Sequence, residues 1–277
     1  MKIVRVFAAM AVLPVALAFN PCARAADPAE DALRATVRIT RGPHSGTGFF
    51  VATREKGEAG VKHFLVTAAH VLTDIEGEKC TVVFRARGKG EEFVRLETDV
   101  VIRDGKKPLW VRHPDVDIAV LAVTIPDRAD VKPFGEHQIA STKMAEERKV
   151  RVGQDVHIPC FPVTLEANSA GWPILRKGSI ASHPLTPLAS AKTIYVDYTN
   201  FNGDSGAPVV ATIENEPSVV GLVIGMQRFT NKTSTPFEER TVHIPLGLAV
   251  VVQSPLISQT LVEWRKAAAK TDPLRQQ

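Results

Sequence analysis

The sequence predicts an all-β fold that ends in a single helix. Short apolar or alternating stretches separated by turn residues recur along most of the 277-residue chain, and helical periodicity is scarce before its C-terminal part. The composition, 44% hydrophobic and 23% charged, is that of a globular protein long enough for one large domain or for two lobes.

The N-terminal segment has the pattern of a secretory signal peptide. Lys2 and Arg5 give a positive start, residues 6–19 form an uncharged apolar run, and Ala23-Arg24-Ala25 fits a small-x-small cleavage site. We therefore interpret residues 1–25 as a signal peptide and expect a mature chain of residues 26–277 that is periplasmic or secreted, without a membrane anchor. An uncleaved anchor is the alternative, and Pro14 inside the short run argues against it.

The charge gives no sign of an anionic partner. The formal net charge is +4, but without Lys2, Arg5 and Arg24 the remaining 31 basic residues face 30 acidic ones. A nearly neutral mature protein lacks the basic patch that nucleic-acid binding requires, so we expect no nucleic-acid partner.

A first set of strands is expected over about residues 36–125. Residues 36–40 alternate, and Gly42-Pro43 and residues 57–60 supply turns. The other predicted strands are 46–52, 63–67, 81–85, 93–102, 110–111 and 118–123, a series typical of a meander or Greek-key barrel. Residues 126–151 are charged and irregular, and we expect them to connect two lobes.

A second set of strands is expected over about residues 152–250. Its predicted members include 156–158, 174–180, 193–196, 208–212, 219–224 and 241–244. The pattern then changes from strand to helix, because Ser254-Pro255 supplies an N-cap and a first helical residue. A helix over about 254–270 would place Leu256, Ile257, Leu261, Val262 and Trp264 near one face, which we interpret as a packing surface.

The stretch Gly203-Asp204-Ser205-Gly206 has the composition of a nucleophile turn. A serine hydroxyl attacks a carbonyl only if it is exposed, loses its proton to a base and has its oxyanion stabilised. The two glycines allow unusual dihedral angles and close approach of a substrate backbone. The backbone N–H groups of Gly203 and Ser205 could then converge on an oxyanion.

His70 and Asp117 are the candidates for the base and for its orienting acid. His70 follows a predicted apolar strand and can accept a proton near neutral pH. Asp117 directly precedes another apolar strand, where a carboxylate needs a hydrogen-bond donor. A metal site made by His113, Asp115 and Asp117 is an alternative, but Pro114 and the lack of a second ligand cluster argue against it.

Three blocks of the sequence resemble, in the right order, the signature blocks of trypsin-like (chymotrypsin-fold) serine peptidases. They are Thr67-Ala68-Ala69-His70, residues 117–121 beginning at Asp117, and residues 203–208 around Ser205. Residues 45–50 are similar to a strand of the bacterial HtrA-like and glutamyl-endopeptidase-like branches. The resemblance implies two six-stranded antiparallel β-barrels with the active site between them.

The resemblance also implies roles for individual residues. Ser205 would be the nucleophile, His70 the general base and Asp117 its orienting acid, with the Gly203 and Ser205 N–H groups as the oxyanion hole. Asp204 would hold the loop through a buried partner. Thr199 would form the base of the substrate pocket, with Leu222, Val223 and Ile224 on its wall; substrates would be proteins or peptides, and no metal or cofactor is implied.

The sequence departs from the family pattern in two places, and two other functions are alternatives. Val71 stands where the animal enzymes have a cysteine, and too few residues follow the peptidase region for the PDZ domain usual in the HtrA group. A catalytically silent binding protein of the same fold and an exported esterase are the alternative functions. After export Cys80 and Cys160 would be an even pair that an oxidising compartment could join.

Overall fold

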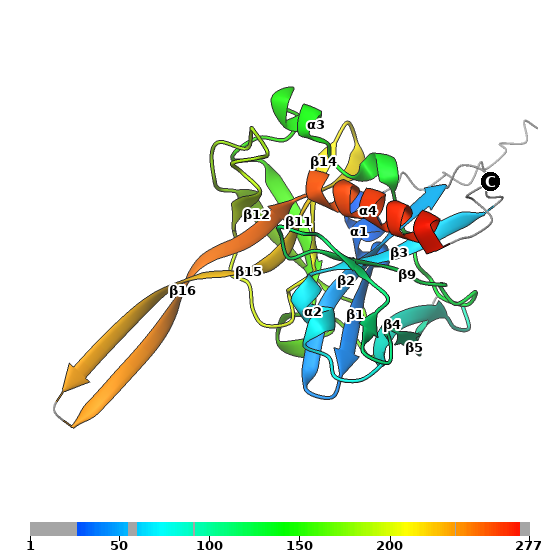
Figure 1. Ribbon diagram of the computed structural model, residues 1–277, viewed down its shortest axis with the longest axis horizontal. Coiled ribbons are helices and arrows are strands. Elements are labelled where there is room, and N and C mark those ends of the chain that lie inside the picture. The colour runs from blue at the N-terminus through cyan, green and yellow to red at the C-terminus, as the bar shows by residue number, and fades with distance from the viewer. Residues whose placement is uncertain (1–26, 55–59, 91, 236, 272–277) are drawn as a thin grey trace, which may run out of the picture.

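The computed structural model describes residues 27–54, 60–90, 92–235 and 237–271, so the predicted signal peptide lies outside the described residues. The described chain is mostly β, and it ends in the expected helix (Figure 1). No helix in this part of the chain is both long and apolar enough to cross a membrane.

A short helix that the sequence analysis missed precedes the first strand. Helix α1 (Pro28–Ala35) begins after Asp27, whose carboxylate accepts the N–H of Ala29 at 2.9 Å, and proline occupies its first turn. Asp27-Pro28 is an N-cap signal that could have predicted this helix.

The first half of the chain forms an open sheet rather than a barrel. Its strand order is β5-β4-β1-β2-β3-β9-β8, and β10 pairs with β2 in parallel. The strands are β1 (Thr36–Arg41), β2 (His44–Arg54), β3 (Val61–Thr67), β4 (Lys79–Arg87), β5 (Phe93–Val101), β8 (Val111–Arg112), β9 (Ala119–Ala122) and β10 (Phe134–Gly135), with a separate pair β6 (Arg103–Asp104) and β7 (Lys107–Pro108).

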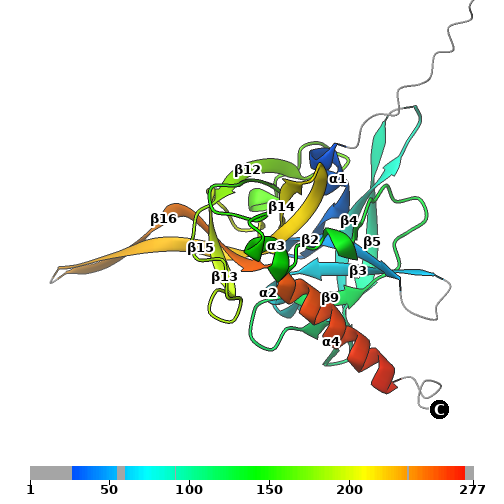
Figure 2. The same ribbon diagram turned by 90° about the horizontal axis from the view of Figure 1, so that it is seen from above.

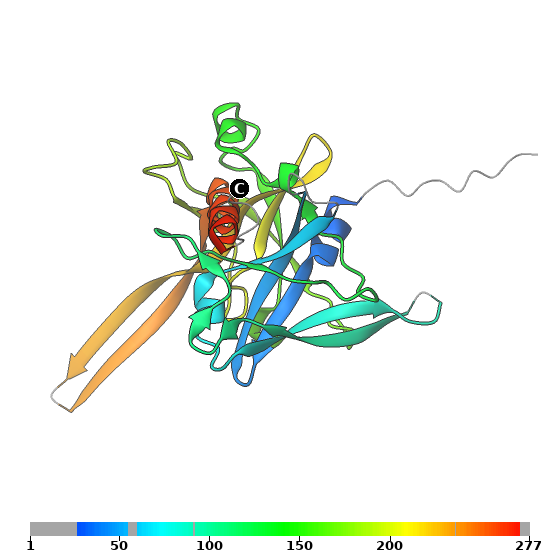
Figure 3. The same cartoon turned by 45° about the vertical axis from the view of Figure 1, so that its right-hand side comes forward.

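The prediction of a six-stranded antiparallel barrel is therefore wrong for this half. Closure would require β8 to pair with β5, but β8 has two residues and Pro114, which cannot donate a backbone hydrogen bond, follows it closely. The described strands β4 and β5 continue as a hairpin away from the body, on the other side from β15 and β16 (Figure 3).

The second half forms the closed six-stranded barrel that was predicted. The order is β11-β12-β13-β16-β15-β14. The strands are β11 (Asp155–Cys160), β12 (Ile174–Ile180), β13 (Thr193–Asp197), β14 (Pro208–Ile213), β15 (Glu216–Thr235) and β16 (Glu238–Gln253). Four short helices interrupt the strands: α2 (Ala69–Thr73) follows β3, η1 (Glu136–Gln138) and α3 (Thr142–Glu146) lie between β10 and β11, and η2 (Pro162–Thr164) follows β11.

Strands β15 and β16 continue beyond the barrel as a long two-stranded arm (Figure 1). Pairing runs on from Arg228 and Pro245 to Thr235 and Glu238 near the tip. Phe229 lies opposite Ile244 on one face of the arm, and both side chains are exposed. Local apolar patterning predicted only residues 219–224 and 241–244, because polar arm residues become strands through their cross-strand partners.

Helix α4 (Pro255–Thr271) packs against the first sheet, beside β8 and β9 (Figure 2). Leu256, Ile257 and Leu261 are buried in the core that the sheet supplies, and Trp264 makes an edge contact with Phe64 at 4.8 Å between ring centroids. The predicted packing face is therefore confirmed except for Val262, which is exposed.

The two described cysteines lie in different cores. Cys80 is buried in the cluster of the first sheet, whereas Cys160 is buried in the barrel cluster, and both are free. The disulfide considered from the sequence is therefore absent, because each thiol points into its own lobe.

Candidate active site

His70 and Asp117 lie together on the first sheet. His70 stands in the first turn of α2, three residues after β3 ends, and Asp117 precedes β9, the neighbour of β3. His70 Nδ1 lies 2.5 Å from Asp117 Oδ2, and the His70 backbone N–H donates to Asp117 Oδ1 at 3.0 Å. Two hydrogen bonds thus fix the orientation of the imidazole and present its Nε2 edge.

This pairing shifts both pKa values toward the charged pair. The hydrogen bond to Asp117 raises the pKa of His70, and partial burial of the ring opposes that change less strongly. Burial acts to raise the pKa of Asp117, but the hydrogen bonds from the His70 ring and backbone outweigh it, so the pKa of the carboxyl is lowered. Asp117 is accordingly suited to stabilise an imidazolium.

The Ser205 turn is attached to the same sheet through Thr47 of β2. The Thr47 N–H donates to the Ser205 carbonyl at 2.9 Å, and the Thr47 hydroxyl donates to the Gly203 carbonyl at 2.7 Å. Gly46, the preceding residue of β2, packs so closely on Val71 that an added Cβ would lie 2.6 Å from its side chain. Strand β2 therefore contacts both the Ser205 turn and the residue that follows His70.

Two peptide groups of the Ser205 turn leave their backbone N–H groups available. The Asn202 carbonyl accepts the Val163 N–H at 2.7 Å, and the Asp204 carbonyl accepts the Ala207 N–H at 2.9 Å. Because a trans peptide directs its N–H opposite to its C=O, the Gly203 and Ser205 N–H groups are turned away from these partners. Within the described residues neither N–H has an acceptor, as an oxyanion hole requires.

Both glycines of the turn are required by their backbone conformation and by close packing. Gly203 has φ +98° and Gly206 has φ +90°. A Cβ at Gly203 would lie 2.3 Å from the Phe161 carbonyl oxygen, and one at Gly206 would lie 1.9 Å from that of Thr47. The turn can reach the first sheet only because Gly206 has no side chain.

Asp204 is completely buried beneath the turn. Its Oδ2 accepts the Phe201 N–H at 2.9 Å and the Tyr198 hydroxyl at 3.5 Å. Burial raises the pKa of Asp204, although the backbone hydrogen bond from Phe201 and an interaction with the Cys160 thiol favour the ionised carboxylate. These are the buried partners that the sequence could not name.

The structure does not join every predicted catalytic group. Among the described residues, no hydrogen bond links the Ser205 hydroxyl to His70. The serine and the imidazole are brought to the same region through β2, but the proton-transfer contact itself is not formed. Such contacts are often long before substrate binds.

The four residues expected at the substrate pocket have different environments. Thr199 is exposed, and its carbonyl accepts a hydrogen bond from Arg176 at 2.8 Å. Leu222 and Val223 are fully buried, one in each core, whereas Ile224 is partly exposed. Thr199 and Ile224 are thus the predicted pocket residues whose side chains solvent can reach.

The three residues of the alternative metal site have separate partners. His113 Nδ1 accepts the Asp115 N–H at 3.1 Å, while the Asp115 carboxylate binds Lys192 at 2.7 Å and Asp117 binds His70. No group of three potential metal-ligating side chains is present in the described residues.

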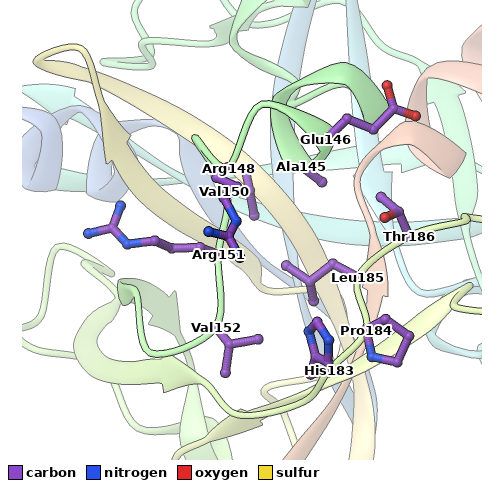
Figure 4. Close-up of a pocket in the computed structure, with 10 residues that line it drawn as sticks. All are labelled: Ala145, Glu146, Arg148, Val150, Arg151, Val152, His183, Pro184, Leu185 and Thr186. Carbon is purple, nitrogen blue, oxygen red and sulfur yellow. The ribbon is translucent and has the colours of Figure 1, made fainter.

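A surface hollow of about 450 Å³ lies elsewhere on the barrel half (Figure 4). It is lined by the end of α3, by residues of the α3–β11 connection and by His183, Pro184, Leu185 and Thr186. It contains none of the predicted catalytic residues, so the hollow and the candidate active site are separate features.

Four residues that were not predicted from the sequence support the site rather than act in it. Thr47, Tyr198, Cys160 and Arg176 all contact the residue 198–206 segment or its buried carboxylate. Only Thr47 carried a signal, since it lies in the glycine-rich stretch 45–50, which resembles a family strand.

No protein with a curated description matches the chain. Among solved structures, the crystal structure of Rv3671c from M. tuberculosis H37Rv, an inactive serine-to-alanine mutant, is similar to it, with 18% identity, a TM-score of 0.47 and coverage of 96% of this chain and 98% of that one. The model of the trypsin-like peptidase domain matches residues 46–222. The chain therefore belongs to the trypsin-like peptidase domain family.

Proposed function

We propose that the chain is an exported serine endopeptidase that acts through an acyl-enzyme. Ser205 Oγ attacks the scissile carbonyl while His70 Nε2 takes its proton, and Asp117 stabilises the resulting imidazolium. The Gly203 and Ser205 N–H groups bind the oxyanion. When the C–N bond breaks, His70 returns the proton to the leaving amine, and water releases the acid by the same route.

One observation carries the proposal: the Ser205 turn, with two N–H groups that lack acceptors, is bonded to the sheet that holds His70 and Asp117. Thr47 binds the carbonyls of Gly203 and Ser205, and the N–H groups of these two residues lack acceptors in the described chain. Family membership supports peptides as the substrate class.

The proposed specificity is for small or medium apolar side chains before the scissile bond. Thr199 and Ile224 are uncharged and accessible, and neither can neutralise a substrate lysine or arginine. Tryptic specificity is accordingly not expected.

A fluorophosphonate probe tests the nucleophile without knowledge of the substrate. We expect mature protein to form one adduct, at Ser205, and Ser205→Ala to form none. A folded parent protein that forms no adduct would refute the peptidase proposal. It would favour the catalytically silent binding protein of the same fold.

Substrate class and export need their own measurements. Cleavage of a peptide library, with Ser205→Ala as control, should show apolar preference before the scissile bond; cleavage of esters alone would favour the esterase. Protein recovered from the host's periplasm or medium should begin at Ala26. An intact Met1 in that fraction would contradict signal cleavage.

A further inference from the structure

A buried polar cluster lies directly under the Ser205 turn and has no role in the proton transfers described above. It consists of Cys160 at the end of β11, Arg176 on β12, Tyr198 just after β13, and Asp204. Cys160, Tyr198 and Asp204 are buried. Three neighbouring barrel strands thus send one polar side chain each toward the segment that carries the nucleophile.

Asp204 links this cluster to the backbone of the turn. Its Oδ2 accepts the Phe201 N–H, while the Asp204 N–H donates to the Phe201 carbonyl at 3.1 Å. The pair of bonds closes the segment between the two residues, which includes Gly203 and hence one N–H of the proposed oxyanion hole.

A buried carboxylate can keep this geometry only if donors compensate its loss of hydration. The Tyr198 hydroxyl is 3.5 Å from Oδ2, and Cys160, which is buried in the same core cluster as Tyr198, interacts with the same carboxylate. Oδ1 has no hydrogen-bond partner among the described residues, so the carboxylate depends on the few donors that it has.

Arg176 supports the outer side of the same segment. Its guanidinium donates to the Thr199 carbonyl and lies 5.6 Å from the Tyr198 ring centroid and 5.7 Å from that of Phe201. Within the described chain no salt bridge involves Arg176, and its positive charge favours the ionised form of Asp204.

We propose that Tyr198 and Cys160 are positioning residues of the candidate active site, which act through Asp204 to hold the Gly203 and Ser205 N–H groups in place. This inference rests on the proposed function for its chemical readout. It does not require either residue to touch substrate.

The chain offers matched controls. Tyr198→Phe removes one hydroxyl, and Tyr195→Phe removes the hydroxyl of the other tyrosine, which lies on β13 and accepts a hydrogen bond from Gln227. Cys160→Ala removes the thiol and its donor, whereas Cys160→Ser replaces the thiol with a hydroxyl donor. Cys80→Ala is the control that removes the buried thiol of the other lobe.

Fluorophosphonate labelling measured over a range of probe concentrations is the first test. We expect Tyr198→Phe and Cys160→Ala to lower the maximal labelling rate roughly tenfold, the scale of one hydrogen bond to a charged group, with the half-saturating concentration unchanged. Cys160→Ser should recover part of the rate. Tyr195→Phe and Cys80→Ala should label like the parent; equal rates for all five variants would overturn the proposal.

Amide hydrogen exchange keeps the inference testable if the parent does not label. Exchange over residues 199–206 should be faster in Tyr198→Phe and Cys160→Ala than in the two controls. Unchanged exchange there would overturn the positioning role, whereas a parent that exchanges normally but forms no adduct would contradict only the proposed peptidase function.

Discussion

The two halves of the molecule hold their parts of the candidate active site by different means. In the open first sheet, His70 and Asp117 are oriented by hydrogen bonds that involve the Asp117 side chain, and both groups remain partly accessible. In the closed barrel, the Ser205 turn is fixed by backbone carbonyls, two glycines with positive φ and a buried carboxylate.

Because of this difference, we expect substitutions in the two halves to affect reactivity and stability differently. A change in the His70–Asp117 pair should alter reactivity and leave packing nearly intact, because the pair is half-exposed. A change in the glycine turn should alter reactivity and stability together, because the turn is packed between the lobes.

The largest effect is expected from Gly206→Ala. The new Cβ would lie 1.9 Å from the Thr47 carbonyl oxygen and 2.3 Å from the Thr67 hydroxyl, at φ +90°. Because the backbone must move to admit the new side chain, we expect the free energy of unfolding to fall by about 3–5 kcal/mol. We also expect fluorophosphonate labelling to be lost. Thermal unfolding measures the change in stability. Gly225→Ala is the control, because a Cβ at that position meets no atom within 4 Å. Equal melting temperatures would contradict the tight packing.

Asp117→Asn should affect reactivity alone. An amide NH₂ facing Nδ1 would force the ring proton onto Nε2, so Ser205 would lose its base, and labelling should fall by about 10⁴-fold. The melting temperature should change little. The matched control is Asp115→Asn, whose carboxylate binds Lys192 at the surface. A large loss of stability in Asp117→Asn would break the contrast between the two halves.

The smallest effect is a displaced pH profile. Labelling needs neutral His70, and the hydrogen bond to Asp117 raises the pKa of His70 above 6.5, so the rate should fall as pH drops through a midpoint above 6.5. The pair should stabilise the fold below pH 6.5, and this contribution should be lost as pH rises through the folded-state pKa. Labelling rates from pH 5 to 9 measure the profile. A midpoint at or below 6.5 would show that the bond does not favour imidazolium.

Much of the site was predictable because its signals are local. His70, Asp117 and Ser205 each stand beside a recognisable strand or glycine turn, and the structure places His70 against Asp117 as expected. The Tyr198 and Cys160 contacts with Asp204 gave no such signal. An isolated tyrosine or cysteine reads as an ordinary core residue until three strands bring it to the same carboxylate.

The sequence by itself determined the succession of short strands along the chain, the C-terminal helix and the residues able to carry acyl-transfer chemistry. These follow from periodicity, turn residues and side-chain type, which act over a few residues. Only the tertiary structure decided that the first sheet stays open, that β15 and β16 extend as an arm, and that Cys80 and Cys160 remain apart. Those outcomes depend on pairings between distant segments. So do the free N–H groups of Gly203 and Ser205, which are left open because Val163 and Ala207 bind the carbonyls of the same peptide groups.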